Sequence, residues 1–336
     1  MFKRQKMING RDESSITPAL ISQGPFTIED FEGGLQNLEQ LHSKKILVLG
    51  AGGLGCEILK NMALSGFKHI DVIDMDTIDI SNLNRQFLFR TKDIGKSKAI
   101  VACEFIRKRV KDVNVTPHFA KIQTMGDDFF KQFDLIISGL DNIEARRWVN
   151  SLVISLYDVN DDDSLIPMID GGTEGFRGQS RVIFPRLTAC YECTLSLAPA
   201  VKTQYPVCTI ANTPRLPEHC IEYVNLIEWP KQFPDKKFDA DNPDDVTWLY
   251  DRSLDRAKQF NISGVTRSLA LGVVKNIIPA IASTNAIIAA SCVNEAFKVL
   301  TSCNPNLEYC MQYSGDNEPF TFNFAPEQQA DCPICG

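Results

Sequence analysis

The sequence lacks three features that would assign the chain to a membrane, a secretory route or a nucleic-acid complex. No apolar run approaches the roughly 20 residues that a membrane-spanning helix needs. The N-terminus has no apolar core of the kind found in signal peptides. Basic residues are not in excess, because 35 Lys and Arg stand against 42 Asp and Glu, for a formal net charge of −7. We therefore expect a protein of the cytoplasm and/or the nucleus that binds neither nucleic acid nor a membrane.

The chain is nevertheless rich in cysteine. It contains 11 cysteines, and without a secretory signal these favour thiol or metal chemistry over disulfide bonds. Its 336 residues, of which 44% are hydrophobic, allow about two domains with a sizeable core.

One stretch, residues 46–86, organises the rest of the chain. The apolar run Ile46–Leu49 predicts a buried parallel strand, and a helix over Leu54–Ser65 is predicted soon after it. Between them, glycines follow a GxGxxG spacing. The free N–H groups at the start of the helix point at whatever lies over these glycines, and this geometry suits a phosphate. The candidate nucleotide-binding glycines are Gly50, Gly52, Gly53 and Gly55.

The residues that follow decide between two classes of nucleotide enzyme. The strand Ile70–Ile73 ends at Asp74, at about the distance where a dinucleotide-binding unit places its ribose-binding acid. The glycine motif alone therefore favours a nicotinamide or flavin oxidoreductase. Such an enzyme has no use for a further carboxylate at Asp76 or for cations at Arg85 and Lys98. ATP does, because cations pair with its phosphates and carboxylates help to hold its Mg²⁺.

A third strand ends in another polar motif. The predicted strand Leu135–Ser138 is followed by Gly139, Leu140, Asp141 and Asn142. In open α/β sheets ligands bind at the carboxyl ends of the strands, so Asp141 is expected at the nucleotide site.

Together these motifs resemble one enzyme family. GAGGLG, DMD, SNLNRQF, GKSKA and GLDN occur in the order and spacing of the ubiquitin-activating enzyme superfamily, which includes the bacterial adenylyltransferases of thiamine and molybdopterin synthesis. The resemblance runs from about Gly24 to the last residue. It implies an α/β fold, a Rossmann-like adenylation domain of the ThiF/MoeB type, that binds ATP and Mg²⁺.

The resemblance also implies roles for the site residues. Asp141 is the main Mg²⁺ ligand with Asp76 assisting, and Asp74 holds the ribose hydroxyls. The remaining polar residues contact the phosphates or complete the pocket: Asn82, Arg85, Lys98 and Gln86. Fixed cations such as Arg85 and Lys98 stabilise the charge that develops on the phosphates, which makes them catalytic together with Asp141.

Two CxxC pairs predict a zinc site. Cys190 and Cys193 form the first pair, and Cys332 and Cys335 form the second. Four thiolates are what a closed tetrahedral zinc site needs, and both pairs have counterparts in the family. A single pair would equally suit a redox motif. Because four thiolates leave no open ligand position, the zinc is expected to be structural.

The sequence changes character over residues 195–264, where prolines cluster and sheet-like alternation vanishes. We interpret this segment as an inserted, mainly helical subdomain. Residues 1–23 are expected to form a flexible tail, and residues 24–194 and 265–336 the adenylation domain. In the latter, the segment Gly171–Gly175 is predicted to turn, and Gly178–Pro185 to form an antiparallel strand.

The insertion contains the candidate nucleophile, Cys208. It follows a proline-ended loop and precedes a predicted helix, whose N-terminus favours a thiolate. A lone cysteine is more often a small buried apolar residue, and Cys220 is a rival nucleophile. However, CTIANTPR and the following RLPEHCIEY resemble the catalytic-cysteine loop of the two-subunit activating enzymes, which favours Cys208. For His219 a structural role is expected rather than that of a base.

The loop resembles most closely that of the neddylation (Nedd8/Rub) branch of the family. This implies adenylation of a ubiquitin-like modifier of the Nedd8/Rub type, formation of a thioester on Cys208, and transfer to the cysteine of a conjugating enzyme. It also implies a heterodimer with a homologous scaffold subunit, since the family usually supplies one ATP-contacting arginine from a partner. Arg181 lies at the family position that we expect to select the modifier.

Other interpretations belong to the same family or to different classes. A SUMO-activating catalytic subunit has a similar cysteine loop, and a sulfur-carrier adenylyltransferase lacks an insertion of this size. A non-catalytic scaffold subunit would have degenerate nucleotide residues, whereas here they are intact. The oxidoreductase remains the alternative of a different class.

Overall fold

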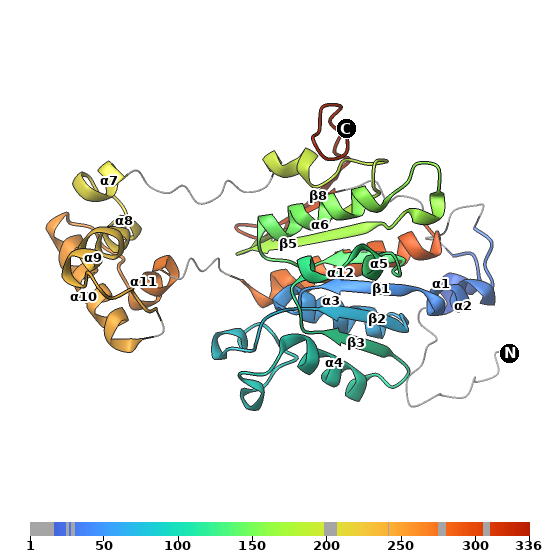
Figure 1. Cartoon of the computed structure of the whole chain (residues 1–336), viewed down its shortest axis with the longest axis horizontal. Helices are drawn as coiled ribbons and strands as arrows, with labels where there is room; N and C mark the ends of the chain where they lie inside the picture. The colour runs from blue at the N-terminus through green and yellow to red at the C-terminus, as the bar shows by residue number, and fades with distance from the viewer. Residues whose placement is uncertain are drawn as a thin grey trace. The chain divides into compact units, whose positions relative to one another are not determined.

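The computed structural model describes residues 17–24, 27, 31–197, 207–240, 242–274, 280–304 and 310–336. The chain divides into two compact units, one made of residues 1–198 and 280–336 and the other of residues 199–279 (Figure 1). The second unit therefore extends to Pro279, beyond the predicted end of the insertion at residue 264. None of the helices in the described ranges is long and apolar enough to cross a membrane.

The first unit is built on a sheet of eight strands in the order β3-β2-β1-β4-β5-β6-β7-β8. Neighbours from β3 to β5 pair in parallel, and those from β5 to β8 pair antiparallel. The predicted antiparallel strand before the first CxxC is thus confirmed as β6. The strands are β1 (Lys45–Leu49), β2 (His69–Ile73), β3 (Asn114–His118), β4 (Leu135–Ser138), β5 (Met168–Glu174), β6 (Arg177–Ile183), β7 (Cys310–Ser314) and β8 (Phe320–Phe324).

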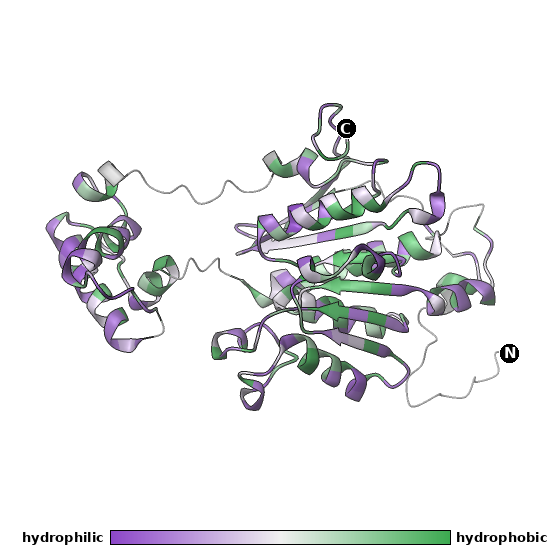
Figure 2. Ribbon diagram, viewed as in Figure 1, coloured by the Kyte–Doolittle hydropathy of each residue, from purple (hydrophilic) through white to green (hydrophobic). Residues whose placement is uncertain are grey.

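Helices cover the two faces of this sheet because alternate strand residues point to opposite sides. On β1, Ile46 and Val48 join a core formed with α3, α4 and α12, whereas Leu47 and Leu49 join a core formed with α5 and α6. Figure 2 shows the central strands as apolar and the outer helices as mixed. These helices are α3 (Gly53–Leu64), α4 (Lys98–Arg109), α5 (Asp127–Phe130), α6 (Ile143–Leu156) and α12 (Ala282–Thr301).

The predicted turn at Gly171–Gly175 is wrong over most of its length. Residues Gly171 and Gly172 continue β5, and only Gly175, with φ +57°, has the left-handed backbone of a turn. A Cβ atom on Gly171 would lie 2.8 Å from Cys292 Sγ, and one on Gly172 would lie 2.6 Å from the Arg146 guanidinium. These glycines therefore serve close packing on the strand rather than chain reversal.

The expected flexible tail, residues 1–23, is also partly wrong. Helix α1 (Thr17–Ile21) belongs to the first unit, and Leu20 is fully buried in the core under the sheet. The Leu20 carbonyl accepts hydrogen bonds from the Gly34 N–H at 3.1 Å and from Asn37 Nδ2 at 2.9 Å. Helix α2 (Leu35–Ser43), which follows, leads into β1.

The second unit is helical in its described part. Its core gathers Cys220, Val224, Leu249, Ala257 and Ala270, and Trp229 packs edge-on against Trp248 with ring centroids 5.3 Å apart. Residues 267–274, which were expected to belong to the adenylation domain, form helix α11 of this unit instead. The elements are α7 (Val207–Asn212), α8 (Pro217–Tyr223), the π-helix Val224–Glu228, α9 (Trp229–Gln232), α10 (Pro243–Gln259) and α11 (Arg267–Val274).

The packing of α1 predicts a measurable contribution to stability. Leu20→Ala should lower the free energy of unfolding by about 2–5 kcal/mol, because it leaves a cavity in the core. Urea denaturation of the full chain measures this difference. Ile21→Ala is the matched control, since Ile21 is 37% exposed and should lose far less. Equal, small effects for both variants would contradict the burial of Leu20 and would support the prediction that residues 1–23 form a flexible tail.

Candidate functional site

The glycine loop joins β1 to α3 with no room for side chains at its centre. Gly50 has φ +93°, and a Cβ atom on Gly55 would lie only 2.0 Å from the Gly50 carbonyl oxygen. The first residue therefore turns the chain, and Gly55 lets the helix pack against the turn. At the N-cap Gly52 no side chain caps α3, so the first N–H groups of the helix remain available to an anion.

Asp74, at the end of β2, lies directly beside this loop. Its carboxylate accepts hydrogen bonds from the Ala51 N–H at 2.6 Å and from the Asp76 N–H at 2.7 Å. Burial raises the pKa of Asp74 above its ordinary value, and these two N–H donors oppose that rise. The carboxylate stands at the carboxyl end of β2 next to the glycine loop, and its role as the ribose-binding acid stays a prediction.

Lys98 and Asp76 form an ion pair with Lys98 Nζ 2.8 Å from Asp76 Oδ2. Lys98 is 8% exposed and opens α4, so its ammonium is held in a defined place. The structure therefore brings together the predicted cation and the predicted assisting Mg²⁺ ligand. Because this ion pair is already formed, an entering cation must share the Asp76 carboxylate with Lys98. An entering phosphate must likewise share the Lys98 ammonium with Asp76.

The segment after β2 places the other predicted phosphate contacts. Asn82 Oδ1 accepts a hydrogen bond from the Asp79 N–H at 2.9 Å, so Asn82 helps to fix the turn. Arg85 is half-buried and donates from Nη1 to the Ser81 carbonyl at 3.0 Å. Gln86 is 3% exposed and its Oε1 has no hydrogen-bond partner in the described structure. An unpaired buried amide oxygen of this kind suits a site that a ligand completes.

The loop after β4 touches the glycine loop. The Gly139 N–H donates to the Leu49 carbonyl at 2.9 Å, and a Cβ atom on Gly50 would lie 3.1 Å from the Gly139 oxygen. Strands β1 and β4 are the pair at which the strand order reverses, and a crevice opens there in folds of this type. Asp141 is exposed just beyond Gly139, and Asn142 begins α6 by accepting the Ala145 N–H at 2.7 Å.

The two CxxC pairs meet in the first unit. Their four sulfur atoms lie within 4.8 Å of one another, and all four cysteines are buried. The Sγ–Sγ distances are 3.8 Å for Cys190–Cys193, 3.7 Å for Cys190–Cys332 and 3.5 Å for Cys193–Cys335. A zinc tetrahedron with Zn–S bonds of about 2.3 Å has edges of about 3.8 Å, whereas a disulfide needs about 2 Å. The cluster therefore fits a closed zinc site.

Arg181 on β6 is buried rather than presented at the surface. It is 3% exposed, its guanidinium lies 5.0 Å from the centre of the Tyr191 ring, and it hydrogen-bonds to Thr194. Asp170 Oδ2 is 3.6 Å from both Arg181 Nε and Arg146 Nη1. Two cations therefore share one carboxylate, and the cluster keeps a surplus positive charge.

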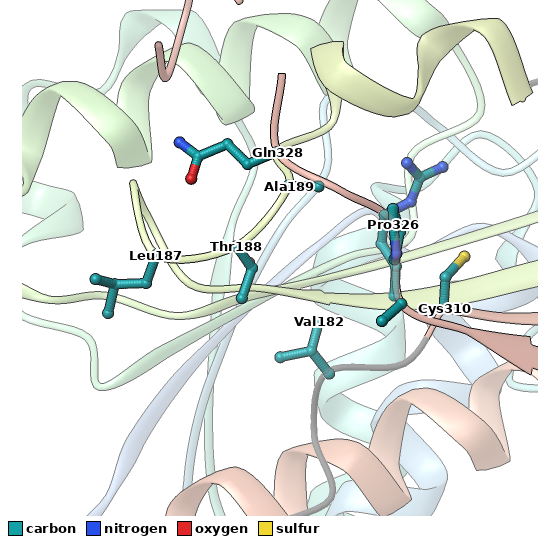
Figure 3. Close-up of a pocket in the computed structure, with 9 residues that line it drawn as sticks. Val182, Leu187, Thr188, Ala189, Cys310, Pro326 and Gln328 are labelled. Atoms are coloured by element: carbon teal, nitrogen blue, oxygen red, sulfur yellow. The ribbon is translucent and has the colours of Figure 1, made fainter. Parts of the chain in front are cut away.

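A pocket lies beside Arg181, between the loop that leads to the first CxxC and the segment after β8 (Figure 3). It is mostly lined by small and apolar side chains. The lining residues labelled in Figure 3 are Val182, Leu187, Thr188, Ala189, Cys310, Pro326 and Gln328.

In the second unit, Cys208 is the second residue of α7, and its side chain lies outside the described part of the structure. The helix itself is anchored by Arg256 on α10. Arg256 Nη2 donates to the carbonyls of Ile210 at 2.8 Å and Ala211 at 2.7 Å, and its guanidinium stacks 3.3 Å from the centre of the Tyr223 ring. The backbone that bears Cys208 is thus tied to the helical core.

The rival thiol occupies a different environment. Cys220 is fully buried in the core of the second unit, and burial raises its pKa. A buried thiol with a raised pKa is a poor nucleophile. His219 Nδ1 accepts the Arg215 N–H at 3.1 Å, and burial lowers the pKa of the imidazole. This geometry agrees with the structural role expected for His219.

Three polar residues beside these sites are absent from the sequence-based predictions: Arg146, Arg256 and Asn285. Arg146 donates to the carbonyls of Leu140 and Gly171 and so links the loop after β4 to β5. Asn285 lies beside Gly53. The only sequence signal for Asn285 is a polar residue among small ones at the start of α12.

Comparison with known protein families matches residues 27–334 to the ThiF family. The chain belongs to the ThiF family. Within the family it is 54% identical, over 93% of its length and 74% of the relative's, to a NEDD8-activating enzyme E1 catalytic subunit of Dictyostelium discoideum. The subunit of the same name from Drosophila melanogaster is 52% identical, over 93% of this chain and 71% of the length of that relative.

Two further similarities are more limited. The SUMO-activating enzyme subunit 2 of Dictyostelium discoideum is 48% identical, but the match covers only 58% of this chain and 28% of the length of that subunit. The crystal structure of E. coli MccB with ATP superposes with a TM-score of 0.58 and 20% identity, over 91% of this chain and 70% of that chain. The latter similarity supports the fold alone.

The cysteine cluster leads to a prediction about metal content. Purified protein should contain one zinc per chain, and Cys332→Ser should lower both the zinc content and the melting temperature, because three thiolates no longer close the site. Elemental analysis and thermal denaturation measure the two effects. Cys292→Ser is the control, since Cys292 is equally buried but outside the cluster. It should lose stability and retain its zinc. A fully stable wild-type protein without zinc would refute the assignment.

Proposed function

We propose that this chain activates a ubiquitin-like modifier of the Nedd8 type. It couples ATP-dependent adenylation of the modifier's C-terminus to formation of a thioester on Cys208. The observation that carries the proposal is that one ThiF-family chain gathers the predicted nucleotide-binding residues at one edge of a sheet and carries Cys208 on a helix of a separate unit. The similarity to NEDD8-activating enzyme E1 catalytic subunits over 93% of the chain supports the choice of modifier.

In the first step the modifier's C-terminal carboxylate attacks the α-phosphate of ATP. A carboxylate–phosphorus bond forms, the bond between the α- and β-phosphates breaks, and pyrophosphate leaves. The glycine loop and the first turn of α3 bind phosphate oxygens, and Asp74 holds the ribose. Asp141 and Asp76 would hold the Mg²⁺, which neutralises phosphate charge when bound. Lys98, partly released from its ion pair with Asp76, contacts the phosphates together with Arg85 and Asn82. Gln86 closes the pocket.

In the second step the Cys208 thiolate attacks the acyl carbon of the adenylate. A carbon–sulfur bond forms, the bond from carbon to the AMP oxygen breaks, and AMP leaves. The modifier then passes to the cysteine of a conjugating enzyme by exchange of one thioester for another. The anchoring of α7 by Arg256 supports this step, since it fixes the backbone around the nucleophile.

We also propose a homologous scaffold subunit as the partner. The support is the similarity to proteins named as catalytic subunits, a name that implies a second subunit.

The zinc cluster has a structural role, because it ties the segment of Cys332 and Cys335 to the loop after β6. We further propose a cytoplasmic and/or nuclear location, which the acidic composition and the abundance of free thiols support.

Modifier choice is assigned to Arg181. The surplus positive charge of Arg146, Arg181 and Asp170 lies in a buried environment and beside a pocket. A modifier with an arginine just before its C-terminal diglycine would be repelled there, whereas one with a neutral residue would not. Arg181 therefore discriminates between modifiers through the charge of its guanidinium, although this side chain is not exposed to solvent.

The test compares two modifiers in ATP–pyrophosphate exchange, with the partner subunit added, because the isolated chain should show little exchange. The wild-type enzyme should prefer the Nedd8-type modifier to ubiquitin, and Arg181→Gln should shift the ratio of their kcat/KM values toward ubiquitin about tenfold, or about 1.4 kcal/mol. Arg177→Gln is the matched control, since Arg177 lies on the same strand but is exposed and paired with Asp316. It should leave the ratio unchanged. An unaltered ratio in Arg181→Gln would refute the selectivity assignment, and exchange with SUMO alone would refute the choice of modifier.

A further inference from the structure

Asn285 lies where α12 meets the phosphate loop. It stands in the first turn of α12, is 2% exposed, and its Oδ1 accepts a hydrogen bond from the Thr173 hydroxyl at 2.7 Å. The other end of the amide, Nδ2, has no hydrogen-bond partner among the described residues. A Cβ atom on Gly53 would lie 2.5 Å from Nδ2, so the amide rests against the first residue of α3.

An unpaired amide donor at this depth requires an explanation. A buried donor without a partner is destabilising, and native proteins avoid such groups unless a ligand or water completes them. In the structure the Thr173 hydroxyl donates to the amide oxygen, and this arrangement leaves the nitrogen on the side of Gly53. The N-terminus of α12 adds a positive partial charge at the same place.

We propose that Asn285 is a further substrate-binding residue of the nucleotide site. Its Nδ2 donates a hydrogen bond to an oxyanion that enters at Gly53 beside the uncapped N-terminus of α3. This inference rests on the proposed function, since adenylation brings two such oxyanions together. They are the α-phosphate of ATP and the C-terminal carboxylate of the modifier. A donor held in place by Thr173 stabilises either of them without rearrangement during the reaction.

Thr173 acts as a positioning residue in this arrangement. It is the sixth residue of β5, and its hydroxyl contacts Asn285 across 112 positions of the chain. In the observed arrangement this bond holds Oδ1 and leaves Nδ2 facing Gly53. Without it, the side chain could rotate by half a turn and present an oxygen, which repels an oxyanion, to the site.

The experiment uses the assembled enzyme and modifier-dependent ATP–pyrophosphate exchange. Asn285→Asp keeps the size and the acceptor for Thr173 but replaces the donor by an oxygen. It should lower exchange at least tenfold. Thr173→Val should lower exchange less, because the donor remains but is no longer oriented. A rise in KM for ATP would identify the α-phosphate as the acceptor, and a fall in kcat or a rise in KM for the modifier at saturating ATP would identify the carboxylate.

Two controls separate this inference from simpler explanations. Asn285→Leu removes the donor without adding a charge, so a loss of exchange at an unchanged melting temperature supports the role even if the Asp variant folds poorly. Exchange at the wild-type rate in Asn285→Asp or Asn285→Leu would overturn the inference and leave the proposed function intact. A wild-type enzyme that shows no exchange with any modifier would instead overturn the proposed function.

Discussion

The contact between the start of α3 and the end of β1 is the constraint on which the nucleotide site depends. Gly55 packs so closely against the Gly50 carbonyl that no side chain fits between them, and this closeness brings the uncapped end of α3 to the carboxyl edge of the sheet. Asp74 hydrogen-bonds to the same loop from β2, and Gly139 packs against it from β4. A shift of the helix by the width of one methyl group would separate the phosphate-binding N–H groups from the carboxylates that serve the same ligand.

The division of the chain into two units matches the division of the chemistry into two steps. Activation needs fixed charges and N–H donors, and the parallel part of the sheet supplies them from consecutive strand ends. Acyl transfer needs a reactive thiol. In the helical unit the anchored helix α7 carries Cys208, whereas Cys220 is buried in the hydrophobic core. The antiparallel part of the sheet has a third task. It carries the buried Arg181 cluster and leads to the cysteine cluster, so that the residue proposed to select the modifier and the four thiols that could hold zinc lie in one region.

The sequence predicted the features that local chemistry encodes. The strands β1, β2 and β4 follow from apolar runs, and the loop that leads from β1 into α3 follows from the spacing of the glycines. The misinterpreted turn at Gly171 has a physical cause, since glycine permits both chain reversal and close packing and a single sequence does not separate the two. Helix α1 has five residues, too few to show a period. Asn285 and Arg256 were missed because their partners, Thr173 and Ile210, lie 112 and 46 positions away.

The central claim is that one chain performs two separable chemical steps, and a set of three variants tests it most directly. Modifier-dependent ATP–pyrophosphate exchange reports adenylation, and a reductant-sensitive adduct with the modifier reports the thioester. Cys208→Ala should retain exchange and lose the adduct, whereas Asp141→Ala should lose both, because Mg²⁺ and the triphosphate are then neither held nor neutralised. Cys220→Ala should retain both activities. If Cys208→Ala still forms the adduct while Cys220→Ala does not, or if Asp141→Ala retains exchange, the account of the site is contradicted.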